Sequence, residues 1–146
     1  MILTPYLIVK GAPAALDFYT RAFGAKEELR LTNPTGTIGH AHMTIGDSAF
    51  MLADEHPEFG ALSPVTLGGS PITLHLTVAD PDAAAQRAVD AGATLLRPVQ
   101  DQFHGNRSGM VADPFGHKWA LSAEIEKIDG EEMQRRYAEL MAGEEA

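Results

Sequence analysis

The sequence predicts an α+β fold made of two βαβββ modules followed by a C-terminal helix. Three observations support this prediction. Turn signals divide residues 1–55 into a strand, a helix and three further strands. The same order of elements returns over residues 72–126. An alignment of the chain with itself, offset by 68 or 69 residues, superimposes equivalent strands and turns. The repeated order indicates a duplicated unit.

Local signals define the first module, residues 1–55. The run from Leu3 to Val9 is apolar and short, which is typical of a buried strand. Pro13 suits the first turn of a helix, and Gly24 suits the position just after its last turn. Three strands are then expected, over residues 27–32, 38–45 and 49–53.

The second module, residues 72–126, carries equivalent signals. Asp80 followed by Pro81 starts a helix that Gly92 ends. Its strands are expected over residues 72–78, 94–99, 109–112 and 118–123. Residues 56–71 are rich in proline and glycine and form the linker, so residues 1–126 make one domain.

Residues 127–146 are expected to form an amphipathic C-terminal helix with an acidic tail. The segment from Asp129 to Glu132 has the spacing of a capping box. Apolar side chains then recur on one helical face, at Met133, Tyr137, Leu140 and Met141. This stripe needs a partner surface, either the body or a second subunit, and we expect a homodimer.

Composition limits the class of function. The chain of 146 residues has no cysteine, which excludes thiolate metal sites, cysteine nucleophiles and disulfides and fits a reducing, cytoplasmic location. No signal peptide or membrane span is expected, because no apolar run approaches about 18 residues. A net charge of −9 argues against nucleic acid or an anionic membrane as a partner. A small molecule or another protein remains.

Several motifs resemble one protein family. The segments ALDFYTRAFGA, after the first strand, and DPFGHKWAL, in the last hairpin, are similar to those of the glyoxalase/bleomycin-resistance/dioxygenase superfamily, also called vicinal oxygen chelate proteins. The segments IGHAHMTIGDSAFMLADE and DQFHGNRSGMVADPFGHKWAL resemble its PhnB-like branch. The resemblance covers roughly residues 3–137. It implies two curled sheets that form a cleft, in a superfamily of isomerases, lyases, dioxygenases, thiol transferases and drug-sequestering proteins.

The resemblance also implies where a metal would bind. Metal-dependent members place a ligand on the first and last strand of each module, and in this chain those positions are Thr4, Met51, Thr73 and Ala120. A divalent ion needs imidazole or carboxylate donors, which hydroxyl, thioether and methyl groups do not replace. We therefore expect no metal site and no cofactor.

Strand alternation predicts which side chains line the cleft. His75 shares a face with Thr73, and Tyr6 shares one with Thr4. His40 and His42 lie on one face of the middle strand, opposite Ala41 and Met43. We therefore expect a pocket with His75 and Tyr6 as candidate catalytic residues and with these candidate ligand-binding residues: His40, His42, Thr73, Met51 and Arg107.

Each candidate has a structural alternative. The paired histidines are also explained as half-buried side chains satisfied by their neighbours, and His75 as part of the packed core. Arg107 either clamps an acidic ligand or pairs with Asp101 or Asp113.

Three other groups are interpreted as structural. Trp119, the repeat partner of Phe50, is placed in the core, His117 in a tight turn, and Asp54 with Glu55 in a loop-capping role.

Two hypotheses for the function remain. The first is a protein that binds a small, partly apolar molecule in a cleft without the family's metal ligands. The second is an enzyme of the same superfamily, of the lyase, isomerase or dioxygenase type. It would use either a non-standard metal site or metal-free acid–base chemistry by His75 or Tyr6.

Overall fold

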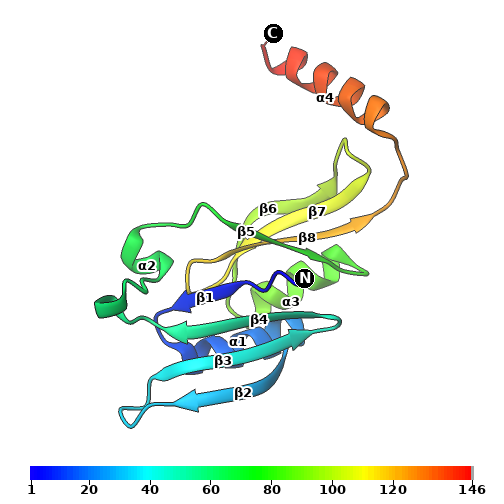
Figure 1. Ribbon diagram of the computed structural model, residues 1–146. Helices are drawn as coiled ribbons and strands as arrows, with labels where there is room; N and C mark the ends of the chain where they lie inside the picture. The colour runs from blue at the N-terminus through cyan, green and yellow to red at the C-terminus, as the bar shows by residue number, and fades with distance from the viewer. Residues whose placement is uncertain (146) are drawn as a thin grey trace.

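The computed structural model describes residues 1–145 and contains two four-stranded sheets (Figure 1). The first sheet has the order β1-β4-β3-β2, with β1 (Tyr6–Val9), β2 (Lys26–Thr32), β3 (Ile38–Ile45) and β4 (Ser48–Asp54). The second has the order β5-β8-β7-β6, with β5 (Thr73–Thr77), β6 (Thr94–Asp101), β7 (Asn106–Ala112) and β8 (Lys118–Glu124). In each sheet the first strand runs parallel to the fourth, and the other pairs are antiparallel. The predicted pair of βαβββ modules is confirmed.

Three long helices and two short ones complete the chain. They are α1 (Ala12–Phe23), the 3-10 turn η1 (Pro57–Phe59), α2 (Pro64–Leu67), α3 (Pro81–Ala91) and α4 (Gly130–Glu145). The two short helices lie in the linker, where the sequence predicts none. In α2, the Ser63 side chain caps the helix by accepting the Thr66 N–H. The Glu55 carboxylate accepts the Ser63 N–H, and hydrogen bonds from Ser63 and Thr66 lower the pKa of Glu55 to about 2.

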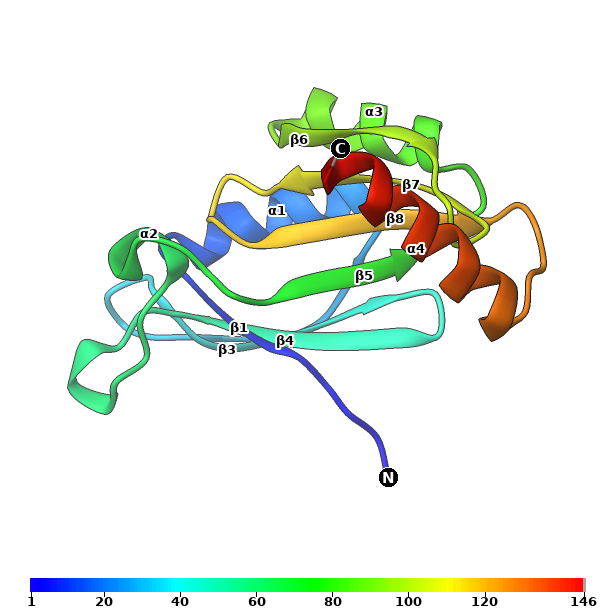
Figure 2. The ribbon, with the colours of Figure 1, turned by 90° about the horizontal axis from the view of Figure 1, so that it is seen from above.

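Each sheet has one face covered by helices, the helix face, and an opposite open face. On β3, Ala41 and Met43 are fully buried on the helix face, whereas His40 and His42 lie on the open face and are half-buried. The predicted division of this strand is confirmed. In Figures 1 and 2, α1 lies behind β3 and β4, so Figure 1 looks onto the open face of the first sheet.

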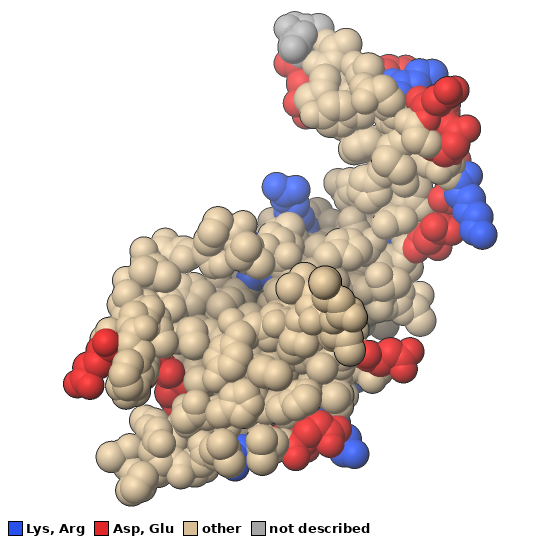
Figure 3. Space-filling view, in the orientation of Figure 1, with Lys and Arg blue, Asp and Glu red and all other residues tan. Residues whose placement is uncertain are grey.

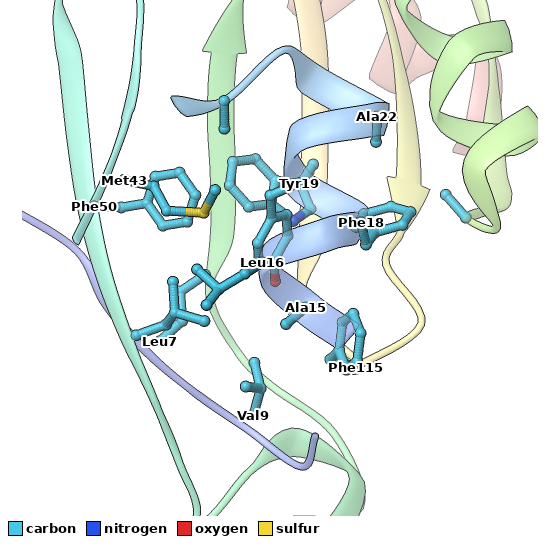
Figure 4. Close-up of a cluster of buried hydrophobic side chains, with 14 of the residues drawn as sticks. Leu7, Val9, Ala15, Leu16, Phe18, Tyr19, Ala22, Met43, Phe50 and Phe115 are labelled. Carbon is cyan, nitrogen blue, oxygen red and sulfur yellow. The ribbon is translucent and has the colours of Figure 1, made fainter. Parts of the chain in front are cut away.

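The core joins the two modules through α1. Tyr19 lies with its ring 5.3 Å from that of Phe50 on β4 and 5.5 Å from that of Trp119 on β8. Figure 4 shows Tyr19, Leu16 and Phe18 projecting from α1 among apolar side chains of the strands and of the β7–β8 turn. The interpretation of Trp119 and Phe50 as core residues is confirmed.

A buried carboxylate lies at the centre of this junction. Asp113, in the turn between β7 and β8, is 4% exposed and accepts four hydrogen bonds. Oδ2 accepts the Tyr19 hydroxyl at 2.6 Å and the Trp119 Nε1–H at 2.9 Å, while Oδ1 accepts the backbone N–H of Phe115 and His117. Burial, the nearby Asp113 charge and this hydrogen bond raise the pKa of Tyr19 well above 10. One side chain of the second module thus anchors the helix of the first.

Two other groups have the structural roles expected from the sequence. The Asp54 carboxylate accepts the N–H groups of Gly11 and Ala12 and caps α1, whose own preceding residue is a glycine without a side-chain cap. The His117 Nε2 lies 2.9 Å from the Ile8 carbonyl oxygen, which links the β7–β8 turn to β1.

The C-terminal helix projects away from both sheets (Figure 1). The Asp129 carboxylate accepts the Glu132 N–H, which confirms the predicted cap of α4. Arg136 fixes the base of the helix by pairing with Glu126 and donating to the Phe103 carbonyl.

The apolar stripe of this helix has little contact with the body. The Tyr137 ring contacts Phe103, yet Tyr137 and Leu140 remain 46% and 45% exposed. The body therefore does not bury the stripe, and its burial by a second copy stays a prediction. Within residues 1–145 no helix is long and apolar enough to cross a membrane.

Candidate functional site

The open face of the first sheet carries a row of four side chains, one from each strand. Tyr6 on β1 pairs with Met51 on β4, Met51 with His42 on β3, and His42 with Leu29 on β2. Directly paired residues point to the same face. Tyr6 is 48% exposed and Leu29 45% exposed, so the row presents a largely apolar surface to solvent. In Figure 3, which views this face, charged side chains gather towards the margins.

Tyr6 and His40 form the polar contact of this face. The Tyr6 hydroxyl lies 2.9 Å from His40 Nδ1, and the two rings are 5.5 Å apart, centroid to centroid. When the phenol donates, His40 is the tautomer that carries its proton on Nε2. The predicted meeting of Tyr6 with a β3 histidine on this face is therefore observed.

His42 adds a nitrogen without a partner. Its Nε2 is buried and has no hydrogen bond to any residue that the structure describes. Buried polar atoms are rarely left unpaired, because the lost hydration is then not replaced. The open face of the first sheet therefore combines apolar side chains with one paired and one unpaired imidazole.

The second sheet has the equivalent row. His75 on β5 pairs with Ala120 on β8, Ala120 with Met110 on β7, and Met110 with Arg97 on β6. The Tyr6–Met51 and His75–Ala120 pairs are related by 69 positions, as the self-alignment requires. His75 is exposed on an edge strand, so the alternative of a packed core histidine does not hold.

Two adjoining hollows lie where the modules meet. One, of about 750 Å³, is lined by Thr4, Thr73 and His75, by Asp47 and Ser48 at the turn between β3 and β4, and by apolar residues of both modules. The other, of about 560 Å³, also includes His75. Tyr6, Met51 and Ala120 line neither hollow. The four positions aligned with metal ligands are thus not gathered in either hollow. The expected pocket that joins Tyr6 to His75 is not observed, because Tyr6 contacts His40 on the open face of the first sheet whereas His75 lines the hollows between the modules.

Arg107 lies on the opposite side of the second sheet. It is three residues from Met110 along an unbroken register, which places it on the helix face. Its guanidinium pairs with both carboxylate oxygens of Asp82, in the first turn of α3, and with Asp101. The hydrogen bonds that Arg107 donates to Asp82 and Asp101 raise the pKa of its guanidinium. Of the structural alternatives for Arg107, the pairing with Asp101 is therefore observed. The sequence does not predict the second pairing, with Asp82.

The donor chemistry does not fit the metal site of the family. Met51 and Ala120 lie beside Tyr6 and His75 in their sheets, yet they offer a thioether and a methyl group. Thr4 and Thr73 add only neutral hydroxyl groups. Among residues 1–145, no three histidine, aspartate or glutamate side chains lie close enough to hold a metal ion.

The fold and these two open faces define a class of protein built from duplicated βαβββ modules. The profile of the Glyoxalase/Bleomycin resistance protein/Dioxygenase superfamily matches residues 2–121, and the chain belongs to this superfamily. An uncharacterized protein of Mycobacterium bovis is 44% identical over 135 residues, which cover 90% of this chain and 89% of the relative.

Solved structures agree with this assignment. A gene product of Arabidopsis thaliana superimposes with a TM-score of 0.66 at 28% identity, over 84% of this chain and 98% of its own. A glyoxalase-related enzyme of Fulvimarina pelagi superimposes with a TM-score of 0.68 at 25% identity, over 85% of this chain and 88% of its own.

Proposed function

We propose that this protein binds a small, partly apolar molecule through the open faces of its sheets, and that it belongs to the PhnB-like branch of its superfamily. The observation that carries the proposal is the hydrogen-bonded Tyr6–His40 pair on a sheet face that is otherwise apolar and exposed. Small-molecule sites are built in this way, from apolar surface with a few polar groups that orient the ligand.

The ligand contacts that we assign follow from position on the first open face. Tyr6 and Leu29 offer an aromatic ring and an aliphatic surface, and Met51 lies between them with an adaptable thioether. His42 Nε2, which lacks a partner among the described residues, is available to a polar ligand group after a small side-chain movement. None of these contacts requires a metal ion.

A second candidate is an enzyme that uses the same pair for acid–base chemistry. The 2.9 Å separation between the Tyr6 hydroxyl and His40 Nδ1 allows a proton to pass between phenol and imidazole. In such an enzyme Tyr6 would face the substrate, and His40 would orient the Tyr6 hydroxyl and polarise its O–H bond. An enzyme would turn over its substrate, whereas a binding protein would release the ligand unchanged.

We also infer that the protein is a cytoplasmic homodimer. Apolar side chains are exposed on β2 and on α4, with Leu31 52% and Leu140 45% exposed. A second copy that covers these surfaces would convert an open face into a cleft.

The test is a thermal-shift screen of small aromatic compounds against protein treated with EDTA. Compounds that raise the melting temperature are then titrated by calorimetry into the wild type and into Tyr6→Ala. The control is Phe59→Ala, which alters an exposed aromatic ring in the linker. We expect metal-free binding that Tyr6→Ala weakens by about tenfold and that Phe59→Ala leaves unchanged. Binding that requires an added metal, or that ignores Tyr6→Ala, would overturn the proposal.

A further inference from the structure

The two open faces occupy equivalent positions in the repeat but differ in chemistry. The row of the first sheet ends in Leu29, whereas the row of the second ends in Arg97. Tyr6 is replaced by His75 and Met51 by Ala120 at the equivalent positions. The row of the first sheet is therefore aromatic and aliphatic apart from His42, whereas the row of the second sheet has a basic or polar side chain at each end.

Arg97 stands apart from the other arginines of the chain. Every other arginine donates at least one hydrogen bond to a carboxylate or a backbone carbonyl. Arg97 makes no hydrogen bond or ion pair with any residue in the described range 1–145, although the chain carries a net charge of −9. Arg97 is exposed, so its planar guanidinium is accessible to an acidic ligand group that it can hold through two hydrogen bonds.

Lys118 adds a second basic group to the same face. It pairs with Thr73 and Ala112, one row away from His75 and Met110. Its side chain is half-buried, and it too has no acidic partner in the part of the chain that the structure describes. A half-buried ammonium without a counter-charge is costly unless an anion arrives to pair with it.

The rest of this face suits an anion. It carries hydroxyl and amide groups, at Thr73, Thr77, Asn106, Ser108 and Ser122. Glu124 shares the face but pairs with Asn106 at the far end of β8, four residues from Ala120. Arg97 on β6 and Lys118 on β8 are two strands apart and offset by two residues along the strands, about 12 Å in all, and Met110 lies on the strand between them. A single acidic group above Met110 lies within reach of both long side chains.

From these contacts we infer that the open face of the second sheet binds the acidic group of the ligand, a carboxylate or a sulfonate held by Arg97 and Lys118. The inference rests on the proposed function, because it assigns the ligand of the same site to a class: a monoanionic acid with an aromatic or aliphatic body. His75, on β5 beside the strand that carries Lys118, contributes a further donor.

The experiment compares two probes of nearly equal shape, 2-naphthoate and its uncharged amide 2-naphthamide, by isothermal titration calorimetry. The variants are Arg97→Gln and Lys118→Gln, with Lys127→Gln as the control, because Lys127 is an exposed lysine outside both sheets. We expect each of the two variants to weaken 2-naphthoate binding by about tenfold and to leave 2-naphthamide binding unchanged. Lys127→Gln should alter neither.

The outcomes separate this inference from the proposed function. If both probes bind with similar affinity and ignore Arg97→Gln and Lys118→Gln, the anion site is refuted while binding by the apolar face stands. If neither probe binds the wild type, the proposed function fails and this inference fails with it. Equal weakening of both probes by Lys118→Gln would also refute the anion site, because the uncharged amide gains nothing from the ammonium group; Lys118→Arg, which keeps the charge, should retain 2-naphthoate binding.

Discussion

Replacing Asp113 by asparagine should weaken the contact between the two modules and so lower the free energy of unfolding. The amide nitrogen of the new side chain must face one of two pairs of donors, either Tyr19 and Trp119 or the backbone N–H groups of Phe115 and His117. The least costly choice faces Tyr19, whose hydroxyl can rotate and accept, but the Trp119 N–H then loses its partner. A buried unpaired donor costs about 1–3 kcal/mol, and the remaining bonds lose their charge assistance.

We therefore expect Asp113→Asn to lower the free energy of unfolding by about 3 kcal/mol and the melting temperature by about 6–12 °C. The assay is urea denaturation followed by the fluorescence of Trp119, the single tryptophan, and by far-ultraviolet circular dichroism. The control is Asp17→Asn, whose carboxylate is 66% exposed and pairs with Arg21 on the surface of α1. That pair should contribute well under about 1 kcal/mol. Equal stability of the two variants would refute the role assigned to Asp113.

Three further predictions follow from other parts of the fold. Burial raises the pKa of Tyr19 in the folded protein, so the unfolded state ionises first as the pH rises. The contribution of Tyr19 to the free energy of unfolding should be complete below pH 10 and fall above it. The slope of unfolding free energy against pH should be smaller in Tyr19→Phe, and an unchanged slope would contradict the assignment. In Gly105→Ala, the new Cβ would lie 2.5 Å from the Glu126 carbonyl oxygen, at a residue whose φ is +88°. This variant should destabilise the base of α4. Urea denaturation should show a larger loss of stability than in Gly46→Ala, because no atom lies within 4 Å of a Cβ added at Gly46. Light scattering should give twice the 15.6 kDa of one chain for the wild type and a larger monomer fraction for Leu140→Asp, whereas a wild-type monomer at tens of micromolar would remove the dimer.

The sequence predicts the face on which a side chain lies where residues alternate regularly along a strand or where the position recurs in the second module. The shared face of His40 and His42 follows from a period of two, because the register shift in β3 falls before His40, between Ile38 and His40. The equivalence of Tyr6 and His75 follows from the offset of 69 positions. These residues could be placed because no register shift lies between His40 and His42, nor within the β1–β4 and β5–β8 pairs.

The remaining site residues depend on features that the sequence does not specify. β2 and β6 contain bulges, which change the face of every residue beyond them, so Leu29 and Arg97 could not be assigned to the open faces. The sequence predicts this strand only from residue 109, but β7 begins at Asn106, and this places Arg107 on the helix face beside Asp82.

The six histidines allow a direct test, by nuclear magnetic resonance, of ligand binding by the open faces of both sheets. Imidazole signals are recorded while 2-naphthoate is added to the wild-type protein. Three histidines lie on the open faces: His40, His42 and His75. The other three lie in the linker, in the β6–β7 loop and in the β7–β8 turn: His56, His104 and His117. We predict saturable shifts for the first group and unchanged signals for the second; the reverse pattern would contradict the account.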